Sequence, residues 1–462
     1  MEGLEASVAR ASQLERTSRI DAEYFQKRFL LSAELIAKWQ RKSVQALAHV
    51  SDGNHFTISD AFLDKGIPYY RGQDVTNRFF AETASPICIT QEAYDRKYMR
   101  RSYLQRGDVL LSIVGTIGEL SLVASDDPAT CSCKLAILRP RKTAPEFLAV
   151  FLRSEHGQNQ VERLTRGAVQ KGLILEDMDQ LWVPDVSEGF EKRIAGVVQN
   201  ARAAQEASAS KVNAAEETLL DALGLADWTP PEPLSYAARA SDAFAAGRLD
   251  ARFFAPRIQA LLDILGRDGR SLGDLATSRR QKFRPQDCAT FNYIEIGDID
   301  GAGAATSTPL ACADAPSRAT WHVRPNDIIT STVRPIRRLS AQIAPGQDGY
   351  VASSGFVVID PQQIAPELLL TFLRLPVICE LLDLYASASM YPAVTEAHIL
   401  GLPFPEIDAE VETQVVANIQ EAREAKGQAA QLLEAAKRAV EIAIEDGEPA
   451  AMFFLGKAEG AD

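Results

Sequence analysis

The sequence lacks any run of about 18 apolar residues, so no membrane-spanning helix is expected. Its first residues, MEGLEASVAR, are acidic and lack the apolar stretch of a secretory leader, so the expected compartment is the cytoplasm. Histidine and cysteine are scarce, at five and six residues. Only Cys131 and Cys133 lie close together, and one C-x-C pair without a second pair is a poor zinc motif. We therefore expect reduced thiols and no bound metal.

Several motifs of enzymes are also missing. There is no G-x-x-x-x-G-K-[ST] phosphate loop, no H-E-x-x-H helix and no glycine-rich dinucleotide or S-adenosylmethionine loop after a strand. The N/D-P-P-aromatic element of amino-methyltransferases is absent too. These absences predict a non-catalytic protein without a cofactor of its own. A dispersed carboxylate site of a nuclease stays open, because 62 Asp and Glu residues make chance matches easy.

The net charge of −13 argues against a protein that coats nucleic acid through bulk electrostatics. It leaves room for a protein with local basic clusters, or for one that shares DNA with a more basic partner.

The chain repeats itself at a nearly constant spacing. The motif ARAS occurs twice, and so does the motif R-hydrophobic-D-A, in both cases 229 residues apart. This offset matches Arg10 to Arg239, Arg19 to Arg248 and Asp21 to Asp250. RGDVLLSIVGTIGELS (106–121) faces PNDIITSTVRPIRRLS (325–340) at 219, with Leu120-Ser121 opposite Leu339-Ser340. APEFLAVFLR (144–153) faces APELLLTFLR (365–374), and LWVPDV (181–186) faces LPFPEI (402–407), both at 221. Matches in this order indicate an internal duplication.

Each half shows the same order of expected elements. Short Val- and Ile-rich strands lie between turn residues in 66–75, 109–118, 291–300 and 328–336. A helix follows in each half, with Pro145 or Pro366 at its first position. A short strand ends at Pro184 or Pro405, and a long helix closes the half. The pattern is that of a mixed α+β protein.

The two long helices are expected at about 188–223 and 409–444, each roughly 50 Å long. Both carry an alanine-rich apolar stripe with heptad-like spacing, which must be covered. We expect the helices to pack on each other in antiparallel fashion; packing of each helix on its own domain is the alternative. Gly224 and the prolines after it end the first helix. The tail after Gly447 is expected to fray, with docking through Met452, Phe453, Phe454 and Leu455 as the alternative.

Four motifs in the first half carry a family resemblance: SDGNH (51–55), GIPYYRGQDV (66–75), GDVLLSIVGTIG (107–118) and RGAVQKGL (166–173). Together with the domain–helix–domain–helix order, they resemble the specificity (S) subunits of Type I restriction-modification systems. The second half is more divergent. Its counterparts are EIGDI (295–299), RPIR (334–337) and SMYPA (389–393).

The resemblance implies two duplicated α/β target-recognition domains related by pseudo-twofold symmetry and separated by two long antiparallel coiled-coil helices. It implies a non-catalytic subunit that reads a bipartite DNA target for partner methyltransferase subunits, with two copies expected, and for a motor-nuclease where one is present. S-adenosylmethionine is expected only in the partner. The expected order is target-recognition domain 1 (1–187), spacer helix 1 (188–224), linker (225–235), target-recognition domain 2 (236–408), spacer helix 2 (409–446) and tail (447–462).

Polar residues in loops are the candidates for DNA contact, since Arg can bind guanine and Gln adenine through two hydrogen bonds. Glycines beside them allow the backbone to approach phosphate closely. The first-half candidates are Asn54, His55, Arg71, Gln73, Thr116, Arg166, Gln170 and Lys171. The second-half candidates are Arg280, Lys282, Arg284, Arg334, Arg337, Arg338 and Tyr391, with Arg279 in the same basic cluster. The Arg19–Asp21 and Arg248–Asp250 pairs are interpreted as structural anchors instead.

Two other functions remain alternatives. The chain could be an adaptor that binds proteins through both domains, which the acidic balance favours. It could also be an enzyme with an unrecognised hydrolase or nuclease site. DNA binding that depends on a methyltransferase would separate recognition from the adaptor, and an assay of the isolated chain would reveal an enzyme.

Overall fold

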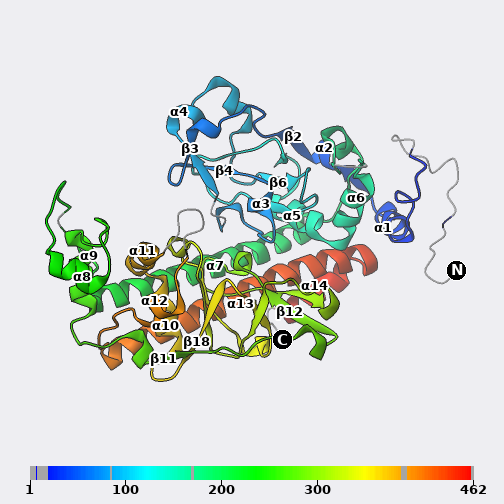
Figure 1. Cartoon of the computed structure of the whole chain (residues 1–462). Coiled ribbons are helices and arrows are strands. Elements are labelled where there is room, and N and C mark those ends of the chain that lie inside the picture. Colours follow the sequence, from blue (N-terminus) through cyan, green and yellow to red (C-terminus); the bar gives the residue numbers. More distant parts are fainter. Residues whose placement is uncertain are drawn as a thin grey trace. The chain divides into compact units, whose positions relative to one another are not determined.

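The computed structural model describes residues 7, 19–83, 86–167, 171–230, 232–386 and 393–458 (Figure 1). The chain divides into two compact units. Unit 1 comprises Met1–Gln205 and Gly427–Asp462, and unit 2 comprises Glu206–Lys426. Two long helices, α7 (Glu188–Leu223) and α13 (Ala409–Asp446), are each divided between the two units, so that one part of each helix belongs to unit 1 and the other part to unit 2. Among the described residues, no helix is long and apolar enough to span a bilayer.

Unit 1 is a mixture of short strands and helices. Its helices besides α7 and α13 are α1 (Lys27–Ala37), α2 (Val44–Leu47), α3 (Gly72–Val75), α4 (Gln91–Tyr94), α5 (Pro145–Arg153), α6 (Glu155–Leu164) and α14 (Glu448–Ala458). Its strands are β1 (Arg41–Ser43), β2 (Ala48–Asp52), β3 (Phe62–Leu63), β4 (Ile67–Tyr70), β5 (Ile87–Ile89), β6 (Val109–Ser112), β7 (Leu120–Leu122), β8 (Thr130–Cys131), β9 (Leu135–Pro140) and β10 (Trp182–Pro184).

Two four-stranded sheets form the body of unit 1. One has the antiparallel order β2-β9-β6-β7, and the other has the order β3-β5-β4-β8, in which β4 and β8 are parallel. Every residue of β6 is buried, as its Val- and Leu-rich sequence predicts. Helix α5 begins with Pro145 at its first turn and buries Phe147 and Phe151, so the predicted proline-started helix is confirmed.

Unit 2 repeats these elements. Its helices besides α7 and α13 are α8 (Ala240–Ala246), α9 (Pro256–Leu265), α10 (Pro366–Arg374), α11 (Pro376–Tyr385) and α12 (Glu396–Leu400). Its strands are β11 (Ala276–Ser278), β12 (Thr290–Ile294), β13 (Thr308–Ala311), β14 (Ala319–His322), β15 (Ile328–Ser331), β16 (Ser340–Gln342), β17 (Val351–Ser353) and β18 (Phe356–Pro361).

The sheets confirm the duplication. The order β11-β18-β15-β16 in unit 2 corresponds to β2-β9-β6-β7 in unit 1. The second sheet of unit 2, β13-β12-β17-β14, keeps the parallel pair β12–β17 where unit 1 has β4–β8. Strand β14 pairs with β17 where unit 1 has only the single bridge Tyr103–Thr130.

One detail of the sequence alignment is wrong. The backbone N–H of Ser112 donates to Glu119, and the N–H of Ser331 donates to Leu339, so Leu339 matches Glu119 and not Leu120. The turn after β15 therefore holds one residue more than the turn after β6. The sequence alignment hid this insertion because both units contain a Leu-Ser pair here, and the two pairs align at the uniform offset although they occupy positions one residue apart in the fold.

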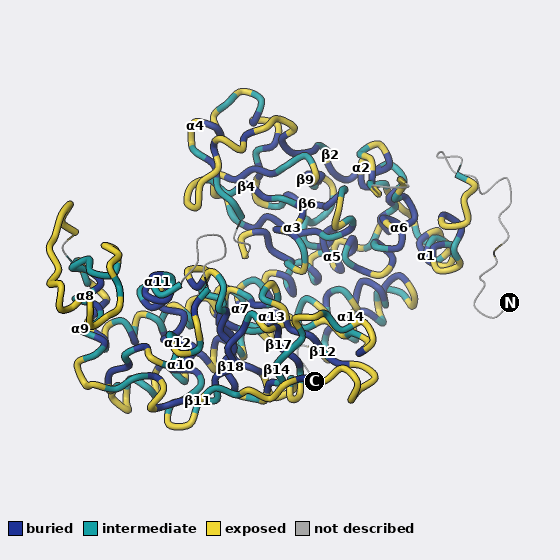
Figure 2. Tube along the Cα trace, in the orientation of Figure 1, coloured by how far each residue is buried: buried dark blue, intermediate teal, exposed yellow. Residues whose placement is uncertain are grey.

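The long helices pack together inside each unit. In unit 1 the buried side chains of Ile194 and Val197 share a core with Val440 and Ile444. In unit 2 Leu219 and Leu223 of α7 share a core with Val415 and Ile419 of α13. Each pairing joins the early part of one helix to the late part of the other, as the antiparallel prediction requires. Figure 2 colours the buried residues of the chain, among them those of β6 and β9, in dark blue.

Three expectations need correction. Cys288 and Cys312 form a disulfide, with their Cα atoms 6.1 Å apart, so these two thiols are not reduced; sequence spacing gave no indication of this contact. Where a frayed tail was expected, α14 buries Ala451 and Leu455 in the unit 1 core. The strand expected before Pro405 is an isolated bridge between Ser271 and Pro403, whereas β10 forms as predicted and pairs with β1.

Candidate nucleic-acid interface

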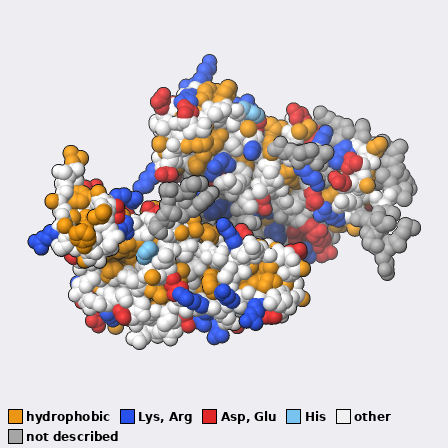
Figure 3. Space-filling model, viewed as in Figure 1, with side chains coloured by type: hydrophobic (Ala, Val, Ile, Leu, Met, Phe, Trp, Pro, Cys, Tyr) orange, Lys and Arg blue, Asp and Glu red, His pale blue; other side chains and the backbone are white. Residues whose placement is uncertain are grey.

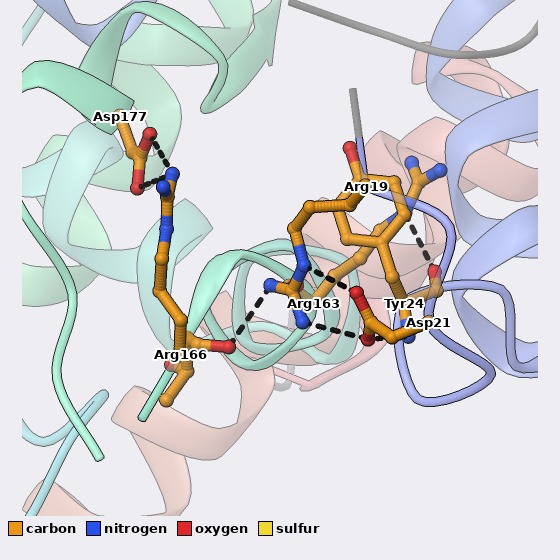
Figure 4. A network of polar contacts seen from close by, with 7 residues as sticks. Arg19, Asp21, Tyr24, Arg163, Arg166 and Asp177 are labelled. Carbon is orange, nitrogen blue, oxygen red and sulfur yellow. Dashed lines mark hydrogen bonds and ion pairs between the residues drawn. The ribbon is translucent and has the colours of Figure 1, made fainter. Parts of the chain in front are cut away.

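The lead segment of each unit is anchored by an arginine–aspartate pair, and Figure 4 shows the pair of unit 1. Arg19 donates from Nε and Nη2 to the two carboxylate oxygens of Asp21, both at 2.8 Å, and from Nη1 to the carbonyl of Arg163. Arg248 pairs with Asp250 at 2.7 Å and donates to the carbonyl of Leu384, the residue that corresponds to Arg163. The Arg19 hydrogen bond lowers the pKa of Asp21. The interpretation of both pairs as structural anchors is confirmed.

Four separate segments of unit 1 meet along one line of backbone contacts, which we call the unit 1 edge: 52–56, 71–74, 113–118 and the described residues 166–167 and 171–172, joined by the turn 132–134. The N–H of Ser132 donates to the carbonyl of Tyr70, and the N–H of Ile113 donates to that of Lys134. Asn54 pairs with Ser132, and Gly172 pairs with both Val114 and Arg166. The structure thus brings the four predicted motifs together.

The 71–74 turn is held from both sides. Asp74, which is buried, accepts hydrogen bonds from the backbone N–H of Arg71 at 2.8 Å and from its Nε at 3.2 Å. Thr116 donates to the carbonyl of Gly72 at 3.3 Å, and a Cβ on Gly72 would lie 3.3 Å from the Ser112 hydroxyl. Glycine therefore permits the close approach of the two loops. Gln73 and Thr116 are exposed, and Arg71 is half-buried.

Arg166 is more constrained than a mobile surface cation. Its Nη2 donates to both oxygens of the buried Asp177 at 2.6 Å (Figure 4). Its side chain is still 40% exposed, so it stays accessible to a ligand. Lys171 is exposed beside Gly172. Gln170 lies outside the described residues.

Asn54 and His55 differ in character. Asn54 is buried and exchanges two hydrogen bonds with the backbone of Phe56, at 2.7 and 3.0 Å, so it shapes the loop. His55 is half exposed, and its Nε2 lies 2.5 Å from Asp52. The other oxygen of Asp52 accepts from Arg101, a residue that the sequence reasoning missed.

Unit 2 builds the same edge from matching backbone contacts. The N–H of Thr332 donates to Gly355, as Ile113 does to Lys134, and Val333 pairs with Ala393 as Val114 does with Gly172. The turn Glu295–Asp298 repeats the Arg71–Asp74 turn, with the Glu295 N–H donating to Asp298 at 2.7 Å. Tyr391, in the segment that corresponds to 166–172, lies outside the described residues.

The arginines of the 334–338 turn have different environments. Arg334 and Arg338 adopt the left-handed backbone conformation, at φ 53° and 60°, where unit 1 has Gly115 and Gly118. A side chain in this region is unfavourable by roughly 1–2 kcal/mol. Arg334 and Arg337 are exposed. Arg338 is turned inward, since it donates to the carbonyl of Arg374 at 2.7 Å and pairs with Glu216.

Arg374 fixes this turn from below. It is buried, and its Nη1 donates to the carbonyls of Arg338 at 2.7 Å and Ser340 at 3.1 Å. Burial lowers the pKa of Arg374 to about 10. The turn therefore has an inward arginine layer and an outward pair, Arg334 and Arg337.

The basic cluster after β11 divides in the same way. Arg279 pairs internally with the buried Asp327 at 2.8 Å, so it does not belong to the surface cluster. Arg280 is exposed and pairs with Glu396 at 2.8 Å. Lys282 and Arg284 are exposed on the loop after β11, as 54–56 follow β2, but Lys282 pairs with Trp321 where Asn54 pairs with Ser132.

A further residue missed in the sequence is Lys134, which is exposed in the turn between β8 and β9 and lies between the 71–74 and 113–118 segments. A polar turn between two strands was the available indication. Many of these cations already face a carboxylate, and Figure 3 shows Lys and Arg side chains interspersed with Asp and Glu on the visible face. The acidic net charge thus coexists with local donors along both edges. Among the described residues, no three His, Cys, Asp or Glu side chains are grouped to hold a metal ion.

The chain matches no protein-family model and no curated protein. Its coordinates resemble the Type I restriction-modification S subunit from M. genitalium, at 12% identity over 88% of this chain and 95% of that one, with a TM-score of 0.37. The HsdS subunit from Thermoanaerobacter tengcongensis is 15% identical over 88% and 97%, with a TM-score of 0.29. A structure described in terms of complex assembly and conformational transition of the type I R-M system is 17% identical over 91% and 97%, with a TM-score of 0.27.

Proposed function

We propose that this chain is the DNA-recognition subunit of a Type I-like restriction-modification or related defence complex. Each unit reads one half of a bipartite duplex target along its edge. The chain has no catalytic role, and it directs partner methyltransferase subunits, which supply S-adenosylmethionine chemistry. Two methyltransferase copies, one for each half, and a motor-nuclease where the system has one, complete the complex.

One observation carries the proposal: the two units share the scaffold of the edge and differ in the side chains on it. Arg71 is replaced by Glu295, and Lys134 by Gly355. Gly115 is replaced by Arg334, although its backbone conformation is kept. Arginine recognises guanine and glutamate accepts from cytosine in the major groove, so these exchanges suit the reading of two different sequences.

The retained strain at Arg334 adds support. A left-handed arginine is unfavourable where glycine serves in the matched turn, and such positions persist where the side chain has a use. An exposed guanidinium on a fixed turn suits contact with a base edge or a phosphate.

The test is a map of methylated bases in cells that carry the chain with its methyltransferase. Arg71→Ala is expected to relax one half of a bipartite motif, by about 1–3 kcal/mol of discrimination at the contacted base. Arg334→Gly is expected to relax the other half only, and it keeps the backbone conformation of the turn. Arg141→Gln, an exposed cation at the opposite end of β9, is the control and should leave the motif intact.

An unaltered motif in both variants, with both proteins folded, would remove these two residues from the interface. The net charge of −13 favours the adaptor as second candidate. An adaptor would bind the methyltransferase, but the resulting complex would not bind DNA through this chain. A recognition subunit would bind the methyltransferase and also make the complex bind DNA. Cleavage or methylation by the isolated chain would contradict the non-catalytic assignment.

A further inference from the structure

A dense basic segment of unit 1 lies between the 66–75 and 107–118 motifs and belongs to neither. Residues 96–101, RKYMRR, hold four cations in six positions, and most of them lie in the 3-10 helix η4 (Lys97–Ser102). The corresponding residues of unit 2, 315–320, are APSRAT, with Arg318 as their single cation. The Tyr103–Thr130 and His322–Val351 pairings set this correspondence.

The four cations are not equivalent. Arg96 is half-buried and donates to the hydroxyl of Tyr98 at 3.1 Å, and Arg101 pairs with Asp52. Lys97 and Arg100 are exposed. In the part of the chain that the structure describes, neither of these two has a carboxylate within ion-pair distance, unlike Arg71 and Arg166 on the edge.

The segment is continuous with the unit 1 edge. The carboxylate of Asp52 binds Arg101 through one oxygen and His55 through the other. The rings of Phe56 and Tyr98 lie 4.3 Å apart, and Phe56 is 56% exposed. Helix η4 therefore extends the edge beyond the 52–56 loop.

The backbone under the cations is rigidly held. Met99 is fully buried in a small apolar cluster of unit 1. Ser102 is also buried, and its hydroxyl donates to the carbonyl of Met99 and accepts from Thr130, both at 2.8 Å. Lys97 and Arg100 thus project from a fixed support, which lowers the ordering cost of binding an anion.

We propose that Lys97 and Arg100 bind phosphates of duplex DNA that flank the half-site read by unit 1. This inference rests on the proposed function and names a contact of the same edge. Unpaired, exposed cations beside a base-reading loop position the duplex without reading its sequence. Unit 2 has one cation at the matching place, Arg318, so this flanking phosphate contact is expected to be weaker there.

The experiment uses the full chain with its methyltransferase, a duplex that carries the mapped target and a scrambled duplex of equal length. Lys97→Gln/Arg100→Gln is expected to make the negative slope of log K against log salt shallower by about 1.8, because each phosphate contact contributes about −0.9 to the slope. The ratio of target to scrambled affinity should stay unchanged. Lys97→Arg/Arg100→Lys should retain the wild-type slope.

Arg141→Gln/Lys142→Gln removes the same two charges at the far end of β9, where both side chains are exposed, and is expected to leave the slope unchanged. An unchanged slope in the Lys97/Arg100 variant, or an equal loss in this control, would overturn the inference while DNA recognition stands. Loss of methyltransferase binding at an intact slope would overturn it too, because the cations would then face a protein. Wild-type complex that does not distinguish the two duplexes would instead contradict the proposed function.

Discussion

At the scale of single residues, one buried carboxylate is neutralised in two different ways. Asp108 is fully buried and accepts two hydrogen bonds from Arg139 of β9, each at 2.7 Å. Its counterpart Asp327 accepts from Arg279, which follows β11. The position of Arg139 is occupied by Asp360 in unit 2, and Arg279 bonds that carboxylate as well, at 2.7 Å. A sequence comparison sees a lost arginine, whereas the sheet supplies another from the neighbouring strand.

These pairs predict unequal stability losses. Asp108→Ala leaves the guanidinium of Arg139 without its carboxylate and is expected to cost about 3–5 kcal/mol of unfolding free energy. Asp327→Ala should cost less, because Arg279 keeps Asp360. Burial also raises the pKa of Asp327, so the folded protein holds this proton more tightly than the unfolded chain does. Its contribution to the free energy of unfolding is therefore present below the ordinary carboxyl pKa and is lost as the pH rises through the raised pKa. Urea unfolding measures both losses.

The control for this comparison is Asp327→Ala/Asp360→Ala, which removes both carboxylates from Arg279 and should approach the loss seen for Asp108→Ala. Equal losses in the two single variants would show that the second carboxylate has no effect.

At the scale of elements, the sequence predicted what local chemistry determines. Proline at the first turn located α5 and α10, and apolar periodicity located α7 and α13. The same local reasoning favoured a frayed tail over a docked one at α14, because Ala451 and Leu455 become buried only through distant residues of unit 1. It also missed the extra residue in the 332–338 turn, since two matching left-handed positions are occupied by glycine in one unit and arginine in the other.

The Cys288–Cys312 disulfide gives a prediction at this scale. It closes a loop with a sequence separation of 24 between η7 (Pro285–Asp287) and η9 (Cys312–Asp314). Its reduction is expected to cost about 2–4 kcal/mol, because the open loop gains conformational entropy on unfolding. Unfolding of unit 2 with and without a reductant measures the loss. Cys288→Ser/Cys312→Ser should unfold like the reduced protein and be insensitive to reductant, whereas Cys379→Ser, at a free cysteine, should keep the sensitivity.

At the scale of the whole molecule, the duplication was predicted from the sequence but the composition of the units was not. The expected domains were continuous stretches, 1–187 and 236–408, with the long helices as separate spacers. The structure instead divides the chain within both helices, so that unit 1 contains a segment from each end of the chain. Sequence patterns show that each helix has an apolar stripe, but which domain covers each part of the stripe depends on three-dimensional packing. The candidate edge was predicted in the same partial way: its loops were identified, but the buried aspartates that orient Arg71 and Arg166 were not.

This discontinuity predicts that unit 1 cannot fold from its N-terminal segment alone. Residues 1–205 leave Phe190, Ile194 and Val197 without the covering side chains of α13 and α14. Each such side chain contributes about 1.5–3 kcal/mol when fully buried, which is a large part of a domain's net stability. Fragment 1–205 is expected to lack a cooperative thermal transition, and the peptide 427–462 should restore one and co-elute with it. The same peptide with Val440→Asp/Ile444→Asp should fail to do so, because it would place charges in the shared core. A fragment that melts cooperatively without the peptide would show that the sheets and α5 suffice, and that the helical segments are only accessory to unit 1.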